Sequence, residues 1–259
     1  MRLFWLDLKR AVLSWGFLGA VLGTFAVYVA GAWVDLPWGV NDVLYYYNVS
    51  AQIGDYKNLL VLLALLPYAI CFASEWNHNV TRYAVIRSNA TKYAVSKAAA
   101  TAIGGGLALA VGLAVFLFVL GIQFPLVDVD RLSEHSFAGY GYGAFLKTGQ
   151  FVLYYLFQVI QIFFVGAFWS MVGLVVSAYM PHGVVILSAP FMISYVLSII
   201  STKLHIPNYL NIRAISRGVF RLTDSPSVNL LFVALYLTGL TVVLACVFVR
   251  KMKRRLANA

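Results

Sequence analysis

Five long stretches of the chain contain no Asp, Glu, Lys or Arg, and they limit the possible folds more than any other feature. They are Ala11–Val34, Asn58–Ser74, Ala98–Val127, Thr148–Thr202 and Ser225–Val249. A helix needs about 20 apolar residues to cross a hydrocarbon core of about 30 Å. The fourth stretch is long enough for two crossings, and Pro181-His182-Gly183 marks a turn near its middle. The sequence therefore predicts a single domain, residues 1–259, with transmembrane helices at approximately 11–34, 57–74, 97–122, 149–178, 183–202 and 227–249.

The composition supports a membrane protein. Hydrophobic residues make up 62% of the chain and charged residues 11%, whereas about a quarter of the residues of an average soluble domain are charged. The apolar stretches lack the roughly ten-residue alternation of membrane β-strands. The first stretch is too long for the apolar region of a cleaved signal peptide, and Asp7 lies among the leading charges. We therefore predict an all-α membrane protein with six transmembrane helices.

The distribution of Lys and Arg predicts the orientation. With six crossings both termini lie on one side, and most of the basic residues are on that side: near the N-terminus, before Ala98 and after Val249. Because basic loops stay in the cytosol, we expect cytosolic N- and C-termini. The net charge of +10 predicts attraction to anionic lipid. No nucleic-acid-binding module is visible in the sequence, so we expect no nucleic-acid partner.

The largest predicted internal loop, Ser74–Lys97, has a helical pattern. Its apolar residues recur every three or four positions, at Trp76, Val80, Tyr83, Ile86, Ala90 and Tyr93. Ser88 and Asn89 interrupt the pattern, and both are good helix N-caps. We therefore predict a short amphipathic helix over about Glu75–Arg87, a bend, and a third span that begins near Thr91. Such a helix lies on the membrane surface or docks into a groove of a cytosolic protein, and the pattern leaves both possibilities open.

The segment FASEWNHNVTRYAVIRSNATKYAVSK resembles the permease subunits of type-2 ABC exporters, in particular the six-span permeases of Gram-positive bacteria. The shared features are an acid and Trp at the end of the second span, followed by Arg-Tyr, Arg, Tyr and Ser-Lys. The amphipathic start MRLFWLDLKRAVLS and the segment IPNYLNIRAISRGVFRLTDSPSVNLL before the last span also resemble the family. Together with the six predicted spans, the resemblance covers most of the chain.

The resemblance implies a fold, partners and site residues. In this family an N-terminal amphipathic helix lies along the inner membrane face, and a coupling helix after the second span sits in a cleft of a cytosolic ATPase subunit. The implied ATPase-coupling residues are Glu75, Trp76, Arg82, Tyr83 and Arg87. The chain is then expected to pair with a second permease, identical or homologous, and with two ABC ATPase subunits in the bacterial cytoplasmic (plasma) membrane. Such an assembly exports a peptide or a hydrophobic small molecule by alternating access.

The residues themselves favour an ATPase on a separate chain. No GxxxxGK[ST] motif is present in the sequence, so no cofactor is expected in this chain, and ATP and Mg are expected on the partner. We expect neither a catalytic site nor a metal site, because the central parts of the predicted spans lack ionisable residues. No two histidines have the i, i+4 spacing of a zinc protease. The alternative function is an ATP-independent membrane carrier or channel.

Two spans carry neutral polar faces. The face on the fourth span consists of Gln150, Tyr154, Gln158 and Gln161, and the face on the fifth span contains Ser194 and Ser198. Side chains of these types form hydrogen bonds between helices. They also suit the wall of a translocation path or an interface between two permeases, and both interpretations stay open.

Three arginines lie on the side predicted to be external. Arg213, Arg217 and Arg221 are spaced four residues apart, and we predict an external helical hairpin over Pro207–Pro226 that carries them as a stripe. The resembling family has short outer helices at this place, before the last span. Because arginine binds phosphate and carboxylate through two parallel hydrogen bonds, we expect the stripe to bind lipid phosphate, with an acidic cargo as the alternative.

Overall fold

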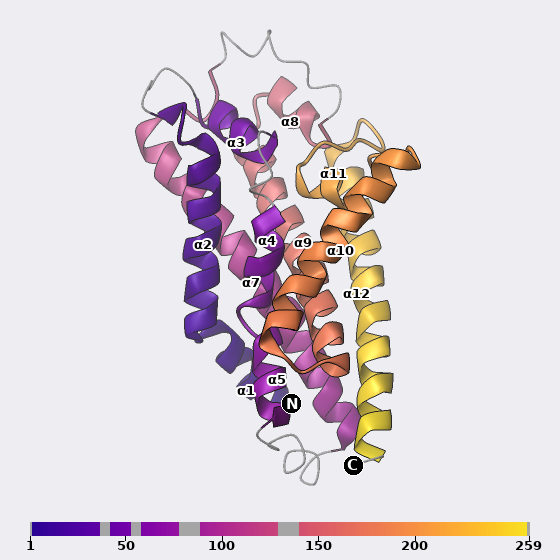
Figure 1. The fold of residues 1–259 in the computed structure, drawn as a ribbon. Coiled ribbons are helices and arrows are strands. Elements are labelled where there is room, and N and C mark those ends of the chain that lie inside the picture. Colours follow the sequence, from indigo (N-terminus) through magenta and orange to yellow (C-terminus); the bar gives the residue numbers. More distant parts are fainter. Residues whose placement is uncertain (1, 37–41, 53–57, 78–88, 129–139, 258–259) are drawn as a thin grey trace.

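The computed structural model describes residues 2–36, 42–52, 58–77, 89–128 and 140–257. Every regular element in these residues is a helix, and the helices form one elongated bundle (Figure 1). Five described helices are long and apolar enough to cross a membrane: α2 (Trp15–Ala32), α7 (Ala90–Gln123), α9 (Phe151–Tyr179), α10 (Gly183–Lys203) and α12 (Pro226–Ala257). The bent pair α4 (Leu59–Leu65) and α5 (Ala69–Asn77) makes a sixth if it is one broken span. The prediction of an all-α, multi-pass membrane protein is confirmed.

The helices α7 and α9 cross at the centre of the bundle, where glycines bring their backbones together. A Cβ atom on Gly105 of α7 would lie 2.5 Å from the Cβ of Ser170, and one on Gly166 of α9 would lie 2.7 Å from the carbonyl oxygen of Gly105. Small residues allow this approach in membranes, where packing replaces the hydrophobic effect between helices. α2 lies on one side of this pair, and α10 and α12 lie on the other (Figure 1).

The second predicted span is broken. α4 and α5 are bent by 49° relative to each other, and Pro67 lies in the break. Proline has no backbone N–H, and its ring clashes with the carbonyl group four residues earlier, so the helix stops before it. The sequence predicts one continuous helix over 57–74, because a search for charge-free stretches is insensitive to proline. The break places Tyr68 inside the bundle, where it is 2% exposed.

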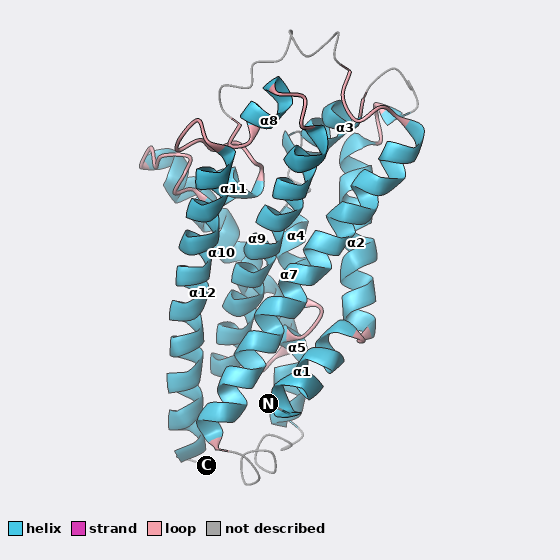
Figure 2. Ribbon diagram, turned by 180° about the vertical axis from the view of Figure 1, so that it is seen from behind, coloured by secondary structure: helices cyan, strands magenta, loops and turns pink. Residues whose placement is uncertain are grey.

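Both termini lie at the same end of the bundle (Figure 1). A helix is present where the sequence predicts the N-terminal amphipathic helix: α1 (Arg2–Val12) packs against α7 at this end. Ser14 starts α2 by accepting a hydrogen bond from the N–H of Phe17. The opposite end carries α3 (Val43–Gln52), α8 (Gly143–Lys147) and α11 (Ile212–Ser216) (Figures 1 and 2).

The predicted external hairpin is a single short helix. Between Pro207 and Pro226, all of which is described, α11 is the only helix before α12 begins. Asn211 caps its start by accepting a hydrogen bond from the N–H of Arg213. Gly218, with φ of 72°, follows its end in the left-handed conformation that glycine adopts easily. The chain therefore turns after one and a half helical turns, and the three arginines do not share one helix.

Candidate functional site

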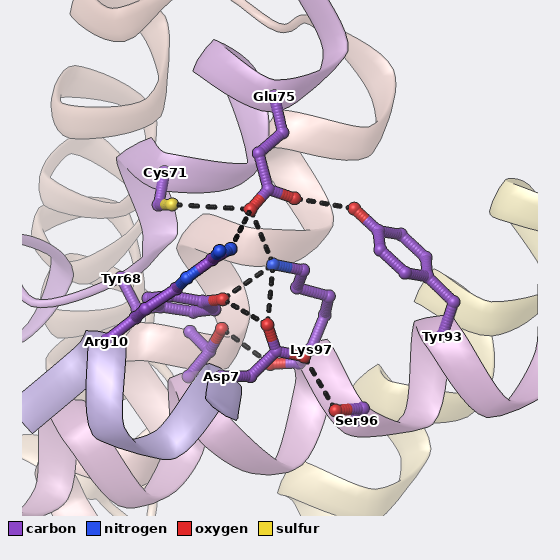
Figure 3. A network of polar contacts seen from close by, with 9 residues as sticks. Asp7, Arg10, Tyr68, Cys71, Glu75, Tyr93, Ser96 and Lys97 are labelled. Carbon is purple, nitrogen blue, oxygen red and sulfur yellow. Dashed lines mark hydrogen bonds and ion pairs between the residues drawn. The ribbon is translucent and has the colours of Figure 1, made fainter. Parts of the chain in front are cut away.

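A group of charged and polar side chains joins α1, α5 and α7 at the end that holds both termini (Figure 3). We call it the buried charge cluster; its members are Asp7, Arg10, Tyr68, Cys71, Glu75, Tyr93, Ser96 and Lys97. Asp7 and Lys97 are 3% and 1% exposed. The two carboxylates of the cluster face one ammonium and one guanidinium group, so its formal charges balance. Buried charges persist in proteins when they are paired in this way.

Lys97 is the centre of the cluster. Its Nζ donates to Oδ1 of Asp7 at 2.9 Å, to Oε1 of Glu75 at 2.7 Å and to the hydroxyl of Tyr68 at 2.6 Å. These bonds use all three donors of the ammonium group. The Nζ also lies 4.8 Å from the centroid of the Tyr68 ring, in the range of a cation–π contact. The ammonium group is therefore removed from solvent but completely hydrogen-bonded.

The carboxylates of the cluster have further donors. Asp7 accepts hydrogen bonds from Tyr68 at 2.7 Å and from Ser96 at 2.6 Å. Glu75 accepts one from the hydroxyl of Tyr93 at 2.6 Å. Arg10 lies at the edge, 3.9 Å from Glu75, with a side chain that is 66% exposed. The interior of the cluster is thus held by short bonds, while its edge is open to solvent.

Helical spacing explains how the sequence builds the cluster. Each helix contributes residues three or four positions apart, which lie on one helix face. They are Asp7 and Arg10 on α1, Cys71 and Glu75 on α5, and Tyr93, Ser96 and Lys97 on α7. Asn89 begins α7 by accepting a hydrogen bond from the N–H of Thr91, which fixes where the face of α7 starts. Three amphipathic faces therefore meet at one point.

The cluster includes one predicted coupling residue and lies next to another. Glu75 and Trp76 belong to the last turn of α5, whereas the sequence predicts that they begin a new helix. Trp76 contacts α12, because the guanidinium carbon of Arg255 lies 5.0 Å from its ring centroid. The other predicted coupling residues, Arg82, Tyr83 and Arg87, lie outside the described residues. The end of α5 is thus bound to three other helices.

Asp7 and Lys97 are functional candidates that the sequence does not single out. Lys97 lies about two turns inside α7 and is buried, near the start of the helix and outside the central part that the sequence predicts to lack ionisable residues. The spacing of Tyr93, Ser96 and Lys97 on one helical face is the signal that could have identified it. Asp7 is the one acid among the charges of the first ten residues. Such an acid on a basic helix indicates a specific partner.

The chemistry of the cluster is that of a connection between helices. In the part of the chain that the structure describes, no group of three or more His, Cys, Asp or Glu residues is placed to hold a metal ion. Cys71 is a free cysteine whose Sγ lies 3.7 Å from Oε1 of Glu75. Breaking a buried ion pair by removing one partner costs about 3–5 kcal/mol. The cluster therefore resists separation of α1, α5 and α7.

The predicted glutamine face is largely buried toward the opposite end. Gln158 and Gln161 are each 1% exposed, and Tyr154 is also buried. Gln158 accepts a hydrogen bond from the hydroxyl of Tyr47 on α3 at 3.0 Å, and Gln161 donates one to the carbonyl of Ile215 on α11. Gln150 precedes α9 and is exposed. The buried glutamines thus connect α9 to two short helices.

The predicted serines and two of the predicted arginines meet at a cavity. This cavity has a volume of about 200 Å³ and lies between α4, α9, α10, α11 and α12; Ser194, Ser198, Arg213 and Arg217 contribute to its lining. Arg213 donates a hydrogen bond to Ser198 on α10. Arg221 does not line the cavity and forms an ion pair with Asp224 instead. The predicted stripe of three arginines is therefore divided.

Comparison of the chain with protein-family models, with curated proteins and with solved structures gives no match in any of the three.

Proposed function

We propose that this chain is the permease subunit of an ATP-driven exporter of the type-2 ABC class. It pairs with a second permease and with separate ATPase chains in a bacterial cytoplasmic membrane, and its termini are cytosolic. It moves a peptide or a hydrophobic small molecule outward by alternating access. The protein itself is not an enzyme, because ATP and Mg bind to the ATPase.

The single observation that carries this function is the buried charge cluster. Glu75 is the first residue of the segment that the sequence predicts to dock on an ATPase, and it lies in the last turn of α5. Lys97 bonds both Glu75 and Asp7, so α5 cannot move away from α1 or α7 without breaking a buried ion pair. A displacement of the docking segment is therefore passed to an N-terminal helix and to a central helix. Packed side chains, salt bridges and rigid helices of this kind carry energetic coupling between distant sites.

The arrangement of the helix ends supports the proposed orientation. α5 ends, α7 begins and α12 ends at the same end of the bundle as the N-terminus (Figure 1). The last turns of α12 carry Lys251, Lys253, Arg254 and Arg255. Basic residues next to membrane helices favour the cytosolic side. An ATPase bound at this end meets the proposed docking segment and both termini.

The test is purification of the tagged chain from membranes of its native cells, with identification of the proteins that copurify. We expect the ATPase and its ATP hydrolysis to copurify. Tyr83→Asp places a charge on the apolar stripe of the docking segment, so it should remove most of the bound ATPase and stop export. The amount of chain inserted in the membrane should stay the same.

The matched control is Tyr209→Asp, the same substitution in the connection before α11, at the opposite end. It should leave ATPase binding unchanged. Undiminished ATPase binding and export in the Tyr83→Asp protein would refute docking through this segment. If no ATPase copurifies with the unmodified chain while transport persists, an ATP-independent carrier or channel replaces the proposed function.

A further inference from the structure

The cavity between α10 and the central helices is large enough to hold a small molecule. Its volume is about 200 Å³, larger than the cavity of about 150 Å³ that binds benzene in an engineered protein core. It follows α10 from Ser194 to Ser201, a distance of about 10 Å at a helical rise of about 1.5 Å per residue. The volume and the length therefore fit one aromatic ring with a short alkyl chain.

The deep wall of the cavity is apolar. It is formed by Leu109 of α7 and by Val165 and Trp169 of α9, and all three side chains are buried. Apolar cavities of this size bind apolar molecules. The deep wall thus favours a ligand whose main part is apolar.

Three hydroxyl groups also line the cavity, and each donates its hydrogen to a backbone carbonyl. Ser194 and Ser201 donate to carbonyls of their own helix, both at 2.7 Å. Tyr236 donates to the carbonyl of Leu210 at 3.2 Å. A hydroxyl group has one hydrogen and two lone pairs, so the capacity that remains on these oxygens is to accept a hydrogen bond.

The hydroxyl groups favour a neutral ligand with an O–H group. A carboxylate or a phosphate dianion has acceptor oxygens and no hydrogen to donate, so it gains nothing from these three groups. Burying an ionised group also costs far more than burying a neutral hydroxyl group that is hydrogen-bonded. An alcohol or a phenol matches both the apolar wall and the acceptor oxygens.

Hydrogen bonds between helices hold the wall in place at the α11 end. Arg213 of α11 donates to Ser198 on α10, and Gln161 on α9 donates to the carbonyl of Ile215 on α11. A second cavity of about 430 Å³ adjoins the first at this end, and the exposed residue Thr202 lines it. The apolar cavity is therefore a defined space between fixed helices, with a polar space beside it.

We propose that this cavity binds a small neutral alcohol or phenol. The ligand donates its hydroxyl hydrogen to Ser194, which lies two turns further from the end of α10 than Ser201, and its apolar part contacts Val165 and Trp169. A lipid with two long acyl chains is much larger than this space, so the occupant is a single small molecule. Binding needs the cavity of one chain and requires neither an ATPase nor a second permease.

The experiment measures binding of para-propylphenol to the purified chain in neutral phosphatidylcholine nanodiscs, by calorimetric titration and by the rise in Tm. Titration of empty nanodiscs corrects for partition into lipid. We expect saturable binding at one site per chain. Ser194→Ala removes the acceptor and should weaken binding by about threefold or more, the effect of one hydrogen bond. The matched control is Ser188→Ala, at an exposed position of the same helix outside the cavity lining, which should leave the affinity unchanged.

A ligand series tests the hydrogen bond. In para-propylanisole a methyl ether replaces the hydroxyl group, so it should bind the unmodified chain more weakly than para-propylphenol. The two ligands should bind the Ser194→Ala protein with nearly equal affinity, because the partner of the hydroxyl group is then absent. Equal affinity of the phenol and the ether for the unmodified chain, or tighter binding of para-propylbenzoate than of the phenol, would overturn the proposed ligand.

Two substitutions test the apolar part of the site. Val165→Leu adds one methylene group to the wall and should weaken binding of para-propylphenol more than binding of phenol. Trp169→Phe enlarges the cavity and should improve binding of para-pentylphenol relative to para-propylphenol. If neither variant changes these relative affinities, the ligand binds elsewhere on the chain and the proposed site is wrong.

Discussion

Lys97 at one end of the bundle and Arg217 at the other are both cations within a helical membrane protein, but their surroundings differ. The Nζ of Lys97 lies within hydrogen-bonding distance of two carboxylates, at 2.9 Å from Asp7 and 2.7 Å from Glu75. Arg217 lines two cavities whose described lining contains no acid. At one end an ammonium group is buried between two carboxylates, and at the other end two arginines line cavities between α10 and α11.

The two ends differ in how completely their charged groups are buried: Lys97 is 1% exposed, whereas the side chain of Arg221 is 39% exposed. An ionisable residue is expensive inside a membrane protein, and it persists where it serves a function. In the buried charge cluster the carboxylates and the ammonium group neutralise each other, so the cluster connects helices. At the cavities, Arg213 donates a hydrogen bond to Ser198, which connects α11 to α10. We therefore expect substitutions of charged residues to lower stability much more at the first end than at the second.

The largest effect is expected for Lys97→Met. This change leaves Asp7 and Glu75 without their shared cation, and the loss of one partner from a buried ion pair costs about 3–5 kcal/mol. We expect a large decrease in the Tm of the purified protein and a smaller amount in the membrane. The control is Lys92→Met, an exposed lysine on the same helix, which should change stability by less than about 0.5 kcal/mol.

Neutralising the acids with the lysine tests whether charge is the cause. The triple variant Asp7→Asn, Glu75→Gln and Lys97→Met leaves no buried charge in the cluster, because Arg10 is 66% exposed, so it should recover part of the lost Tm. A Lys97→Met protein as stable as the unmodified chain would contradict the structural role of the cluster. It would also remove the main support for the proposal that a displacement of α5 is passed to α1.

The sequence predicts the helices well because each depends on a local property. Charge-free stretches of the required length predict where the apolar helices lie, and Asn89 predicts the start of α7. Pro67 shows the limit of this approach. The length and composition of 57–74 fit one span, but the missing N–H of proline breaks it into α4 and α5. Proline alone does not predict a break, however, because Pro190 lies inside the continuous helix α10.

The site could be predicted only in part, because its contacts join distant residues. Glu75 comes from the family resemblance, but its bond to Lys97 and the bond of Lys97 to Asp7 depend on how three helices meet. For the arginines, the sequence predicts an arrangement that the structure does not have. A spacing of four predicts one helical stripe, but Gly218 lies between Arg217 and Arg221 and ends the helix. Because of this turn, Arg213 and Arg217 line the cavity, whereas Arg221 forms an ion pair with Asp224.

A smaller effect is expected for Gln161→Leu, which tests how strongly α9 holds α11 in place. The change removes the hydrogen bond from Gln161 to the carbonyl of Ile215. Hydrogen bonds between membrane helices contribute about 0.6 kcal/mol on average, so the Tm should decrease only slightly. Gln150→Leu, at an exposed position before α9, is the control and should leave the Tm unchanged.

The smallest effect is expected for Asp224→Asn, at the exposed end of the molecule. The ion pair with Arg221 has side chains that are 39% and 86% exposed, and exposed pairs contribute about 0–1 kcal/mol. Its loss should therefore change stability by less than about 1 kcal/mol, and added salt should remove even this difference by screening. Thermal unfolding at low and high salt measures both effects. The Lys97→Met decrease should remain at high salt, because salt screens buried pairs much less. If salt removed the Lys97→Met effect as well, the two ends would not differ in how their charges are buried, and the buried charge cluster would behave as a surface feature.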